Sequence, residues 1–266
     1  MTFLDIAGLV DLTFGPHLLQ VTPESVADFV DVTGDDPGRW TEAAPPGFMA
    51  TALFVVAPDL LGQLTDRSVL HGEQTFEWFR SLAIGSRLAV TGTVTRARER
   101  GGVHFTTFEI KVSDDQGTVA TGSSLFLISG ESAPGKAVAE RTEPTQDDRG
   151  NPQEGQVSAS RMDLVRYAAA TRDWNPVHWD HDSAVAAGLP GVVSHGLLQA
   201  AWAFRAAAGL VSGDRPLSAA RVRFRNPLLP GIPVSIGLER SGSTVNVTLS
   251  DDSVECITAK VELSDE

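Results

Sequence analysis

Cysteine and basic residues are scarce in this chain. Its 266 residues include a single cysteine, Cys256, which excludes an intramolecular disulfide and a zinc site built on several cysteines. Lys and Arg total 21 against 34 Asp and Glu, so the formal net charge is −13. Because a protein that binds the nucleic-acid backbone normally needs a basic surface, nucleic acid is disfavoured as a partner.

Long apolar runs are also missing, although 42% of the residues are hydrophobic, enough for a sizeable core. A membrane-spanning helix needs about 18 apolar residues in succession, and no stretch approaches that length. Asp5 and Asp11 interrupt the apolar N-terminus, and no Lys or Arg precedes them, so the pattern of a secretory leader is absent. We therefore expect a cytoplasmic protein that does not bind a membrane.

A polar segment divides the chain. Residues 131–156 hold one apolar residue larger than alanine, Val138, among Pro, Gly, Gln and charged residues. Because such a segment cannot bury apolar surface, we predict a linker there. It separates an N-terminal unit, residues 1–130, from a C-terminal unit, residues 157–266, each of ordinary domain size.

The C-terminal unit has the pattern of helices followed by a sheet. Ser158–Ala170 has apolar residues at helical intervals, including Met162 and Val165, and Ser194–Leu210 is apolar nearly all round, which is typical of a buried helix. Four segments that follow have strand-like patterns: Ala219–Arg225, Val234–Arg240, Ser243–Ser250 and Val254–Leu263. The simplest packing is one buried helix wrapped by an antiparallel sheet.

The N-terminal unit repeats this order. Helical patterns cover Thr22–Val32 and Gly47–Val56, and four predicted strands follow: Ser68–Phe76, Arg87–Arg96, Val103–Ser113 and Thr118–Ile128. The segment TGDDP at 33–37 aligns with TRDWNP at 171–176 with one residue missing, but the histidines beyond it are not repeated. We infer one functional half and one partner half.

Acidic residues and histidines concentrate in the segment Arg172–His195 of the functional half. Pro176 blocks a regular helix and favours an extended Asn175, so Asp173 and His178 are free to converge. A carboxylate and an imidazole that share one water form an acid–base pair able to work near neutral pH.

A metal site is the alternative for this segment. His178, Asp180, His181 and Asp182 carry suitable donor atoms. Three of them are consecutive and do not share one face, so we expect no metal. We assign His181 and Asp182 to the solvated start of a helical turn over 183–187.

The motifs D-x-N-P-V-H-W-D at 173–180 and G-L-P-G-V-V-S-H-G-L-L at 188–198 resemble the signature of the MaoC-like family. That family includes R-specific enoyl-CoA hydratases and 3-hydroxyacyl-thioester dehydratases with hot-dog folds. The resemblance implies an α+β double hot-dog, in which each of two repeats is a central helix wrapped by an antiparallel sheet and the first repeat is degenerate.

The resemblance also implies the chemistry. Asp173 and His178 would be the catalytic pair, with Asn175 fixing their geometry, and would add water to C3 of a trans-2-enoyl thioester or run the reverse dehydration. The substrate would be an acyl-CoA or acyl-carrier-protein thioester, with no metal and no other cofactor. Backbone N–H groups around Ser194–Gly196 would stabilise the enolate-like carbonyl, and His195 would brace the site.

Several points stay open. Arg172 stands where the family usually has glycine. Because arginine is larger and charged, the local backbone or the access of the substrate is open to differ from that of the family. Arg223 and Arg225 are candidates to contact CoA phosphates or an acidic carrier protein. The alternatives to a hydratase are a hot-dog acyl thioesterase and a non-catalytic acyl-thioester-binding subunit, and a further homodimer is open. The carrier, the chain length and the direction of the reaction are not readable from the sequence.

Overall fold

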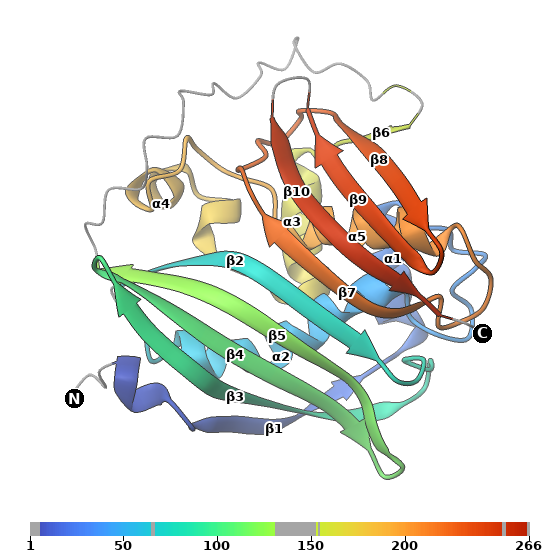
Figure 1. The fold of residues 1–266 in the computed structure, drawn as a ribbon, viewed down its shortest axis with the longest axis horizontal. Helices are drawn as coiled ribbons and strands as arrows, with labels where there is room; N and C mark the ends of the chain where they lie inside the picture. Colours follow the sequence, from blue (N-terminus) through green and yellow to red (C-terminus); the bar gives the residue numbers. More distant parts are fainter. Residues whose placement is uncertain (1–5, 65–66, 131–152, 154, 252–253, 265–266) are drawn as a thin grey trace.

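The computed structural model describes residues 6–64, 67–130, 153, 155–251 and 254–264. Within these residues, ten strands form one antiparallel sheet in the order β1-β3-β4-β5-β2-β7-β10-β9-β8-β6 (Figure 1). The strands are β1 Thr13–Gln20, β2 Arg67–Trp78, β3 Arg87–Arg100, β4 Val103–Asp114, β5 Gly117–Gly130, β6 Gln156–Val157, β7 Leu217–Phe224, β8 Val234–Ser241, β9 Thr244–Ser250 and β10 Glu255–Leu263.

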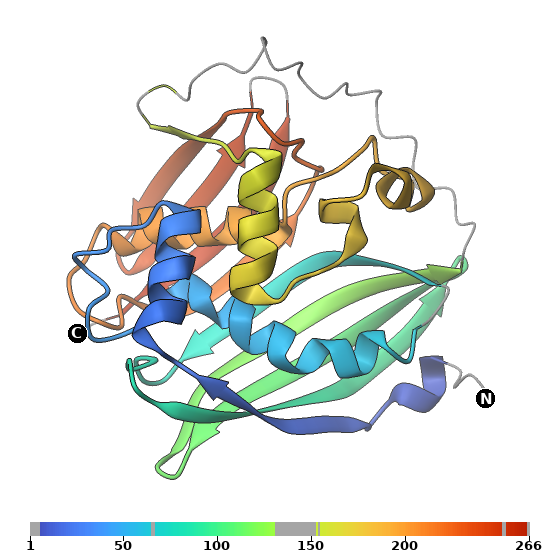
Figure 2. The same cartoon turned by 180° about the vertical axis from the view of Figure 1, so that it is seen from behind.

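The strand order is symmetric about its centre. Strands β1 to β5 occupy mirror-related places to β6 to β10, so that β1 corresponds to β6 and β2 to β7. The two halves meet where β2 pairs with β7, from Glu73 opposite Arg223 to Glu77 opposite Ala219. Figure 2 shows the two long helices, α2 (Met49–Leu61) and α5 (Gly196–Ala208), on one face of the sheet. The expected architecture, a central helix wrapped by an antiparallel sheet and then repeated, is confirmed.

The two central helices form because their sequences are apolar on nearly every side. Ten of the thirteen residues of α5 are buried, as are nine of the thirteen in α2. A helix of this kind is stable only where other elements cover it all round. The sheet covers one side of both helices, and the shorter helices α1 (Pro23–Thr33) and α3 (Arg161–Thr171) lie on the other side (Figure 2).

Helix α3 was predicted correctly, but only part of its predicted apolar pattern, Met162, Val165 and Tyr167–Ala169, is buried. Met162 and Val165 are 68% and 40% exposed, whereas Leu164, Tyr167 and Ala168 point into the protein. Ser160 caps the helix through a reciprocal bond with Asp163, which fixes where the first turn begins. The spacing of apolar residues alone did not reveal that register.

The aligned segments of the two halves match in detail. Helix α1 ends at Gly34 with φ 63°, and α3 ends at Arg172 with φ 67°, both left-handed. Just before them, Thr33 and Thr171 each donate their Oγ1–H to the carbonyl four residues earlier, at 2.8 and 2.7 Å. The backbone turn that leads into the predicted site is therefore present in both halves.

Strand β1 was not predicted. Its sequence, TFGPHLLQ, contains Gly15 and Pro16 and has no clear alternation. β1 is an edge strand, where proline is tolerated because one side of the strand needs no ladder bond. The predicted linker, residues 131–156, lies almost wholly outside the described residues, and its last residue, Gln156, begins β6. No helix in the described ranges is long and apolar enough to span a membrane.

Candidate active site

The segment between α3 and α5 builds the site. After the left-handed Arg172, the chain has no regular secondary structure as far as Asn175 and then forms a short 3-10 turn, Pro176–His178. The Asn175 side-chain oxygen accepts the Val177 N–H at 3.4 Å, and the Asn175 N–H donates to Oδ1 of Asp173 at 3.4 Å. Asn175 thus connects the carboxylate to the turn that carries the imidazole.

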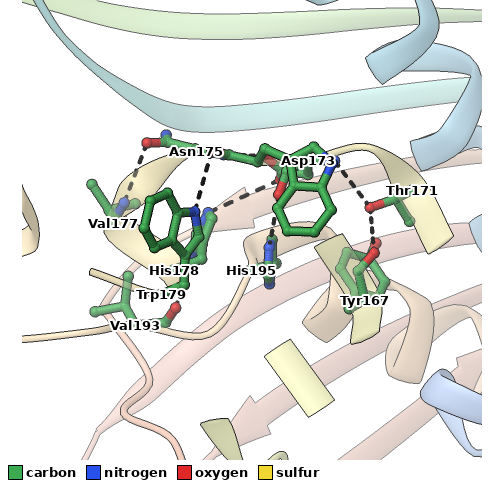
Figure 3. A network of polar contacts seen from close by, with 10 residues as sticks. Tyr167, Thr171, Asp173, Asn175, Val177, His178, Trp179, Val193 and His195 are labelled. Atoms are coloured by element: carbon green, nitrogen blue, oxygen red, sulfur yellow. Dashed lines mark hydrogen bonds and ion pairs between the residues drawn. The ribbon is translucent and has the colours of Figure 1, made fainter. Parts of the chain in front are cut away.

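Asp173 and His178 face each other across 4.0 Å, measured from carboxylate Oδ2 to imidazole Nε2 (Figure 3). On the other side of the ring, Nδ1–H of His178 donates to the Val193 carbonyl at 2.9 Å. That bond places the lone pair of the neutral ring on Nε2, toward the carboxylate. A separation of 4.0 Å is too long for a direct hydrogen bond and suits one bridging water.

Burial sets the electrostatics of the pair. The Asp173 side chain is only 8% exposed, and this burial raises its pKa, against the opposing effects of His178 and the Asn175 N–H. The ring of His195 stacks on that of His178 with centroids 3.8 Å apart, and its Nε2–H donates to the Asp173 carbonyl at 3.2 Å. Burial, with His178 second, lowers the pKa of His195 well below its ordinary value, so His195 braces the site as a neutral ring.

The pair opens onto a cavity of about 230 Å³ to which both halves contribute. Asp173, Asn175 and His178 line one part of it. The N-terminal half supplies mainly apolar walls from α2, β2 and β5: Phe54, Leu61, Val69, Leu70, His71 and Phe126. An apolar cavity with a few convergent polar groups is the usual form of a small-molecule site.

The start of α5 also lines this cavity, through Gly196 and Leu197. The first N–H groups of a helix have no partner inside it and carry partial positive charge. The Ser194 N–H, expected to belong to this donor set, instead donates to the Leu228 carbonyl at 2.7 Å. Its Oγ is buried beside the cavity without a hydrogen-bond partner among the described residues.

Gly196 is required by packing. A Cβ at this position would lie 2.7 Å from the Phe224 ring, well inside contact distance. Gly196 and Phe224 both line the cavity. In the structure the closest neighbour of that Cβ is a side chain of β7.

Family models match both halves. Residues 15–121 match the FAS1-like, dehydratase domain region, and residues 138–262 match the MaoC like domain. Residues 138–262 are a MaoC-like domain. The predicted family is thereby confirmed, and the Asp173–His178 pair lies within the MaoC-like domain.

Relatives and solved structures agree with this assignment. The chain is 26% identical over 220 residues to the peroxisomal multifunctional enzyme type 2 of Drosophila melanogaster, covering 75% of this chain but only 37% of that enzyme. The structure of HtdX from Mycobacterium tuberculosis matches with a TM-score of 0.71 at 21% identity, over 95% of this chain and 99% of that one. A second M. tuberculosis protein, described as a double hotdog fold, matches with a TM-score of 0.62 at 12% identity, over 96% of each chain. The double hot-dog fold is confirmed.

The arrangement of Asp173, His178 and His195 does not fit a metal ion. Asp173, His178 and His195 each offer a donor atom within 4.8 Å of the others. However, the two imidazoles are stacked at an interplanar angle of 26°, so their in-plane lone pairs do not converge on one point at the roughly 2.0–2.1 Å of a zinc–nitrogen bond. In the alternative cluster, Asp180 instead caps helix α4 (His181–Ala186) by accepting the Ser183 N–H, and His181 and Asp182 are exposed.

The arginine candidates differ in position. Arg225 lines the cavity. Arg223 pairs with Glu73 at 3.1 Å across the junction of β7 and β2 and does not line it. Arg172, which replaces the usual glycine, adopts the left-handed conformation that glycine favours, and its side chain lines a different cavity beside α1.

Sequence reasoning missed several residues of this cavity, among them Gln199 and His71. His71 lies on β2 in the half that we expected to contribute no histidine to the site. The pairing of β2 with β7 brings it beside the MaoC-like domain, where its ring lies 4.8 Å from that of Phe224. No local motif marks His71, because only the pairing of distant strands places it there.

Proposed function

We propose that the protein catalyses the reversible hydration of trans-2-enoyl thioesters, equally the dehydration of (3R)-hydroxyacyl thioesters. The observation that carries this proposal is the pair of Asp173 and His178, which face each other across 4.0 Å in a cavity with apolar walls. The match to the MaoC-like family supports the same class of reaction.

The pair would bind one water between Oδ2 of Asp173 and Nε2 of His178. As the water oxygen bonds to C3, the pair accepts one proton from the water and delivers one proton to C2. The net result is the addition of H and OH across the C2–C3 double bond, and the pair returns to its starting protonation. Dehydration is the same path reversed. The fixed Nδ1–H bond of His178 keeps its Nε2 available throughout.

The thioester carbonyl gains negative charge when C3 is attacked. We place it at the start of α5, where the N–H groups of Gly196 and Leu197 would stabilise that charge together with the helix dipole. Asn175 and His195 would act as positioning residues, through their bonds to Asp173.

The N-terminal unit, residues 1–130, would shape the acyl pocket rather than perform chemistry. Asp35, its counterpart of Asp173, follows the equivalent turn but has no aligned histidine. The C-terminal unit, residues 157–266, would carry both catalytic groups. The thioester would arrive on CoA or on acyl carrier protein, and Arg225 is the basic residue placed to contact the carrier arm. The reaction needs no further cofactor.

The test is the loss of enoyl absorbance from trans-2-enoyl-CoA, measured with the wild type, Asp173→Asn and the matched control Asp35→Asn. We expect Asp173→Asn to lose roughly 10²–10⁴-fold in rate, the usual contribution of a positioned acid or base, and Asp35→Asn to be unchanged. Full activity in a folded Asp173→Asn variant would refute the assignment.

Two other outcomes would replace the proposed reaction. Release of free thiol without loss of the enoyl group would indicate thioester hydrolysis. Binding without turnover, on CoA and on acyl-carrier-protein substrates alike, would indicate a binding subunit.

A further inference from the structure

The acyl side of the cavity contains polar atoms that the proposed reaction does not use. His71 and Gln199 line the cavity, and Nε2 of His71 and Oε1 of Gln199 are buried without a hydrogen-bond partner among the described residues, as is Oγ of Ser194 just before α5. Buried polar atoms in proteins are nearly always hydrogen-bonded, and each exception calls for an explanation. The unpaired atoms of His71 and Gln199 are explained if a group of the substrate pairs with them.

Helix α5 and a group of aromatic rings place these two side chains. Gly196 begins α5 next to the catalytic pair, and Gln199 lies one turn further along the same face of the helix. The Phe224 ring packs on Gly196, and His71 packs on Phe224 and Phe126, with ring centroids 4.8 and 5.0 Å apart. His71 and Gln199 therefore line the part of the cavity that the apolar side chains of the N-terminal half enclose.

The chemistry of the two atoms restricts the group that fits. Burial lowers the pKa of His71 to about 4, so the ring is neutral at physiological pH. A neutral imidazole has one donor and one acceptor nitrogen, and an amide likewise has both kinds of atom. A hydroxyl fits both unpaired atoms when Nε2 of His71 carries the proton, because it then donates to Oε1 of Gln199 and accepts from that Nε2–H. A plain alkyl chain would leave both atoms unpaired.

We propose that His71 and Gln199 bind a hydroxyl group on the acyl chain, so that the preferred substrates are enoyl thioesters hydroxylated beyond the reacting double bond. This inference rests on the proposed hydratase function and names its substrate class. A site built to pair with a hydroxyl discriminates strongly against the analogue that lacks it, because the polar groups of the site are then left unsatisfied.

The first test compares trans-2-octenoyl-CoA with its forms hydroxylated at C5, C6 or C7. We expect kcat/KM of the wild type to be at least about tenfold higher for one hydroxylated form, the effect of satisfying one buried polar group. His71→Phe, which keeps an aromatic ring but removes both nitrogens, is expected to abolish that preference. His104→Phe, on β4 and away from the cavity, is the matched control and is expected to keep it.

A binding measurement separates this inference from the reaction itself. Calorimetry on Asp173→Asn, with saturated octanoyl-CoA and its hydroxylated forms, is expected to show the same preference without any turnover. If His71→Phe does not fold, Gln199→Leu is measured instead with the same readout. Equal affinity and equal turnover for all forms in the wild type, or a preference that persists in His71→Phe, would overturn the inference even if hydration of plain octenoyl-CoA is fast.

Discussion

Replacing Arg172 by glycine is expected to stabilise the protein without changing its activity. Arg172 ends α3 with φ 67°, a left-handed conformation that costs an L-residue roughly 1–2 kcal/mol because Cβ crowds the following carbonyl. Glycine removes that strain but gives the unfolded chain more freedom, which costs about 0.4–1 kcal/mol. Subtracting this cost from the strain that is removed gives an expected gain of about 0.5–1 kcal/mol in the free energy of unfolding.

The first half of the chain provides the reverse experiment. Gly34 ends α1 at the aligned position with φ 63°, and an added Cβ would lie 3.0 Å from Nη1 of Arg205. Gly34→Ala therefore introduces the strain that Arg172→Gly removes. Arg205 also donates to the Thr33 and Gly34 carbonyls, so it has little freedom to move away. We expect a loss of about 1 kcal/mol.

Urea unfolding followed by tryptophan fluorescence measures both changes, since a shift in midpoint at constant m-value reports stability directly. Enoyl-CoA turnover is measured on the same samples and is expected to be unchanged in Arg172→Gly, because Arg172 does not line the catalytic cavity. If Arg172→Gly is destabilised, the guanidinium stabilises the native state by more than the backbone strain costs. Backbone strain would then not decide the stability at this position.

Two further predictions concern the site. Gly196→Ala places a methyl group 2.7 Å from the Phe224 ring, so urea unfolding should show a loss of about 1–3 kcal/mol in the free energy of unfolding. Turnover should also fall, because the ring shifts toward His71. Unchanged stability would contradict this expectation. Asp173→Asn should stabilise the fold at neutral pH, because burial raises the pKa of Asp173 and the folded state therefore holds its proton more tightly than the unfolded state. The contribution of protonated Asp173 to the free energy of unfolding is fully present below its ordinary pKa of 3.8 and is lost as the pH rises through the raised pKa. At pH 7 the variant therefore gains about 1.4 kcal/mol for each unit by which the pKa is raised. Near pH 3, where Asp173 is neutral in both states, it gains nothing. Urea unfolding at both pH values checks this, and an equal gain at both would refute it.

Much of the fold was predictable because most elements carry strong local patterns. The segment Ser194–Leu210 is apolar all round and contains α5, and the predicted C-terminal strands match β7 to β10 within a few residues. Strand β1 was not predictable, since its apolar residues do not alternate and its place in the sheet comes from pairing with β3. Local spacing placed Tyr167 and Ala168 among the apolar residues of α3, and both are buried, but the exposure of Met162 and Val165 depends on what packs against the helix.

The candidate site divides in the same way. Asp173 and His178 were predictable because both belong to one short motif, and Pro176 between them restricts the backbone. The role of the Ser194 N–H in a bond to Leu228, and the presence of His71 in the cavity, depend on residues far away in the chain. Such contacts arise only once the sheet has formed.

The pairing of β2 with β7 has a consequence for how such a site changes over time. In an assembly of two identical subunits, every substitution appears twice, at both copies of a surface. Here the two halves of the symmetric sheet belong to one chain, so a substitution in one half leaves the other half unaltered. A histidine such as His71 can arise on one side of the junction without an equivalent imidazole on the other. Covalent linkage of the halves thus permits a single, asymmetric pocket within a symmetric framework.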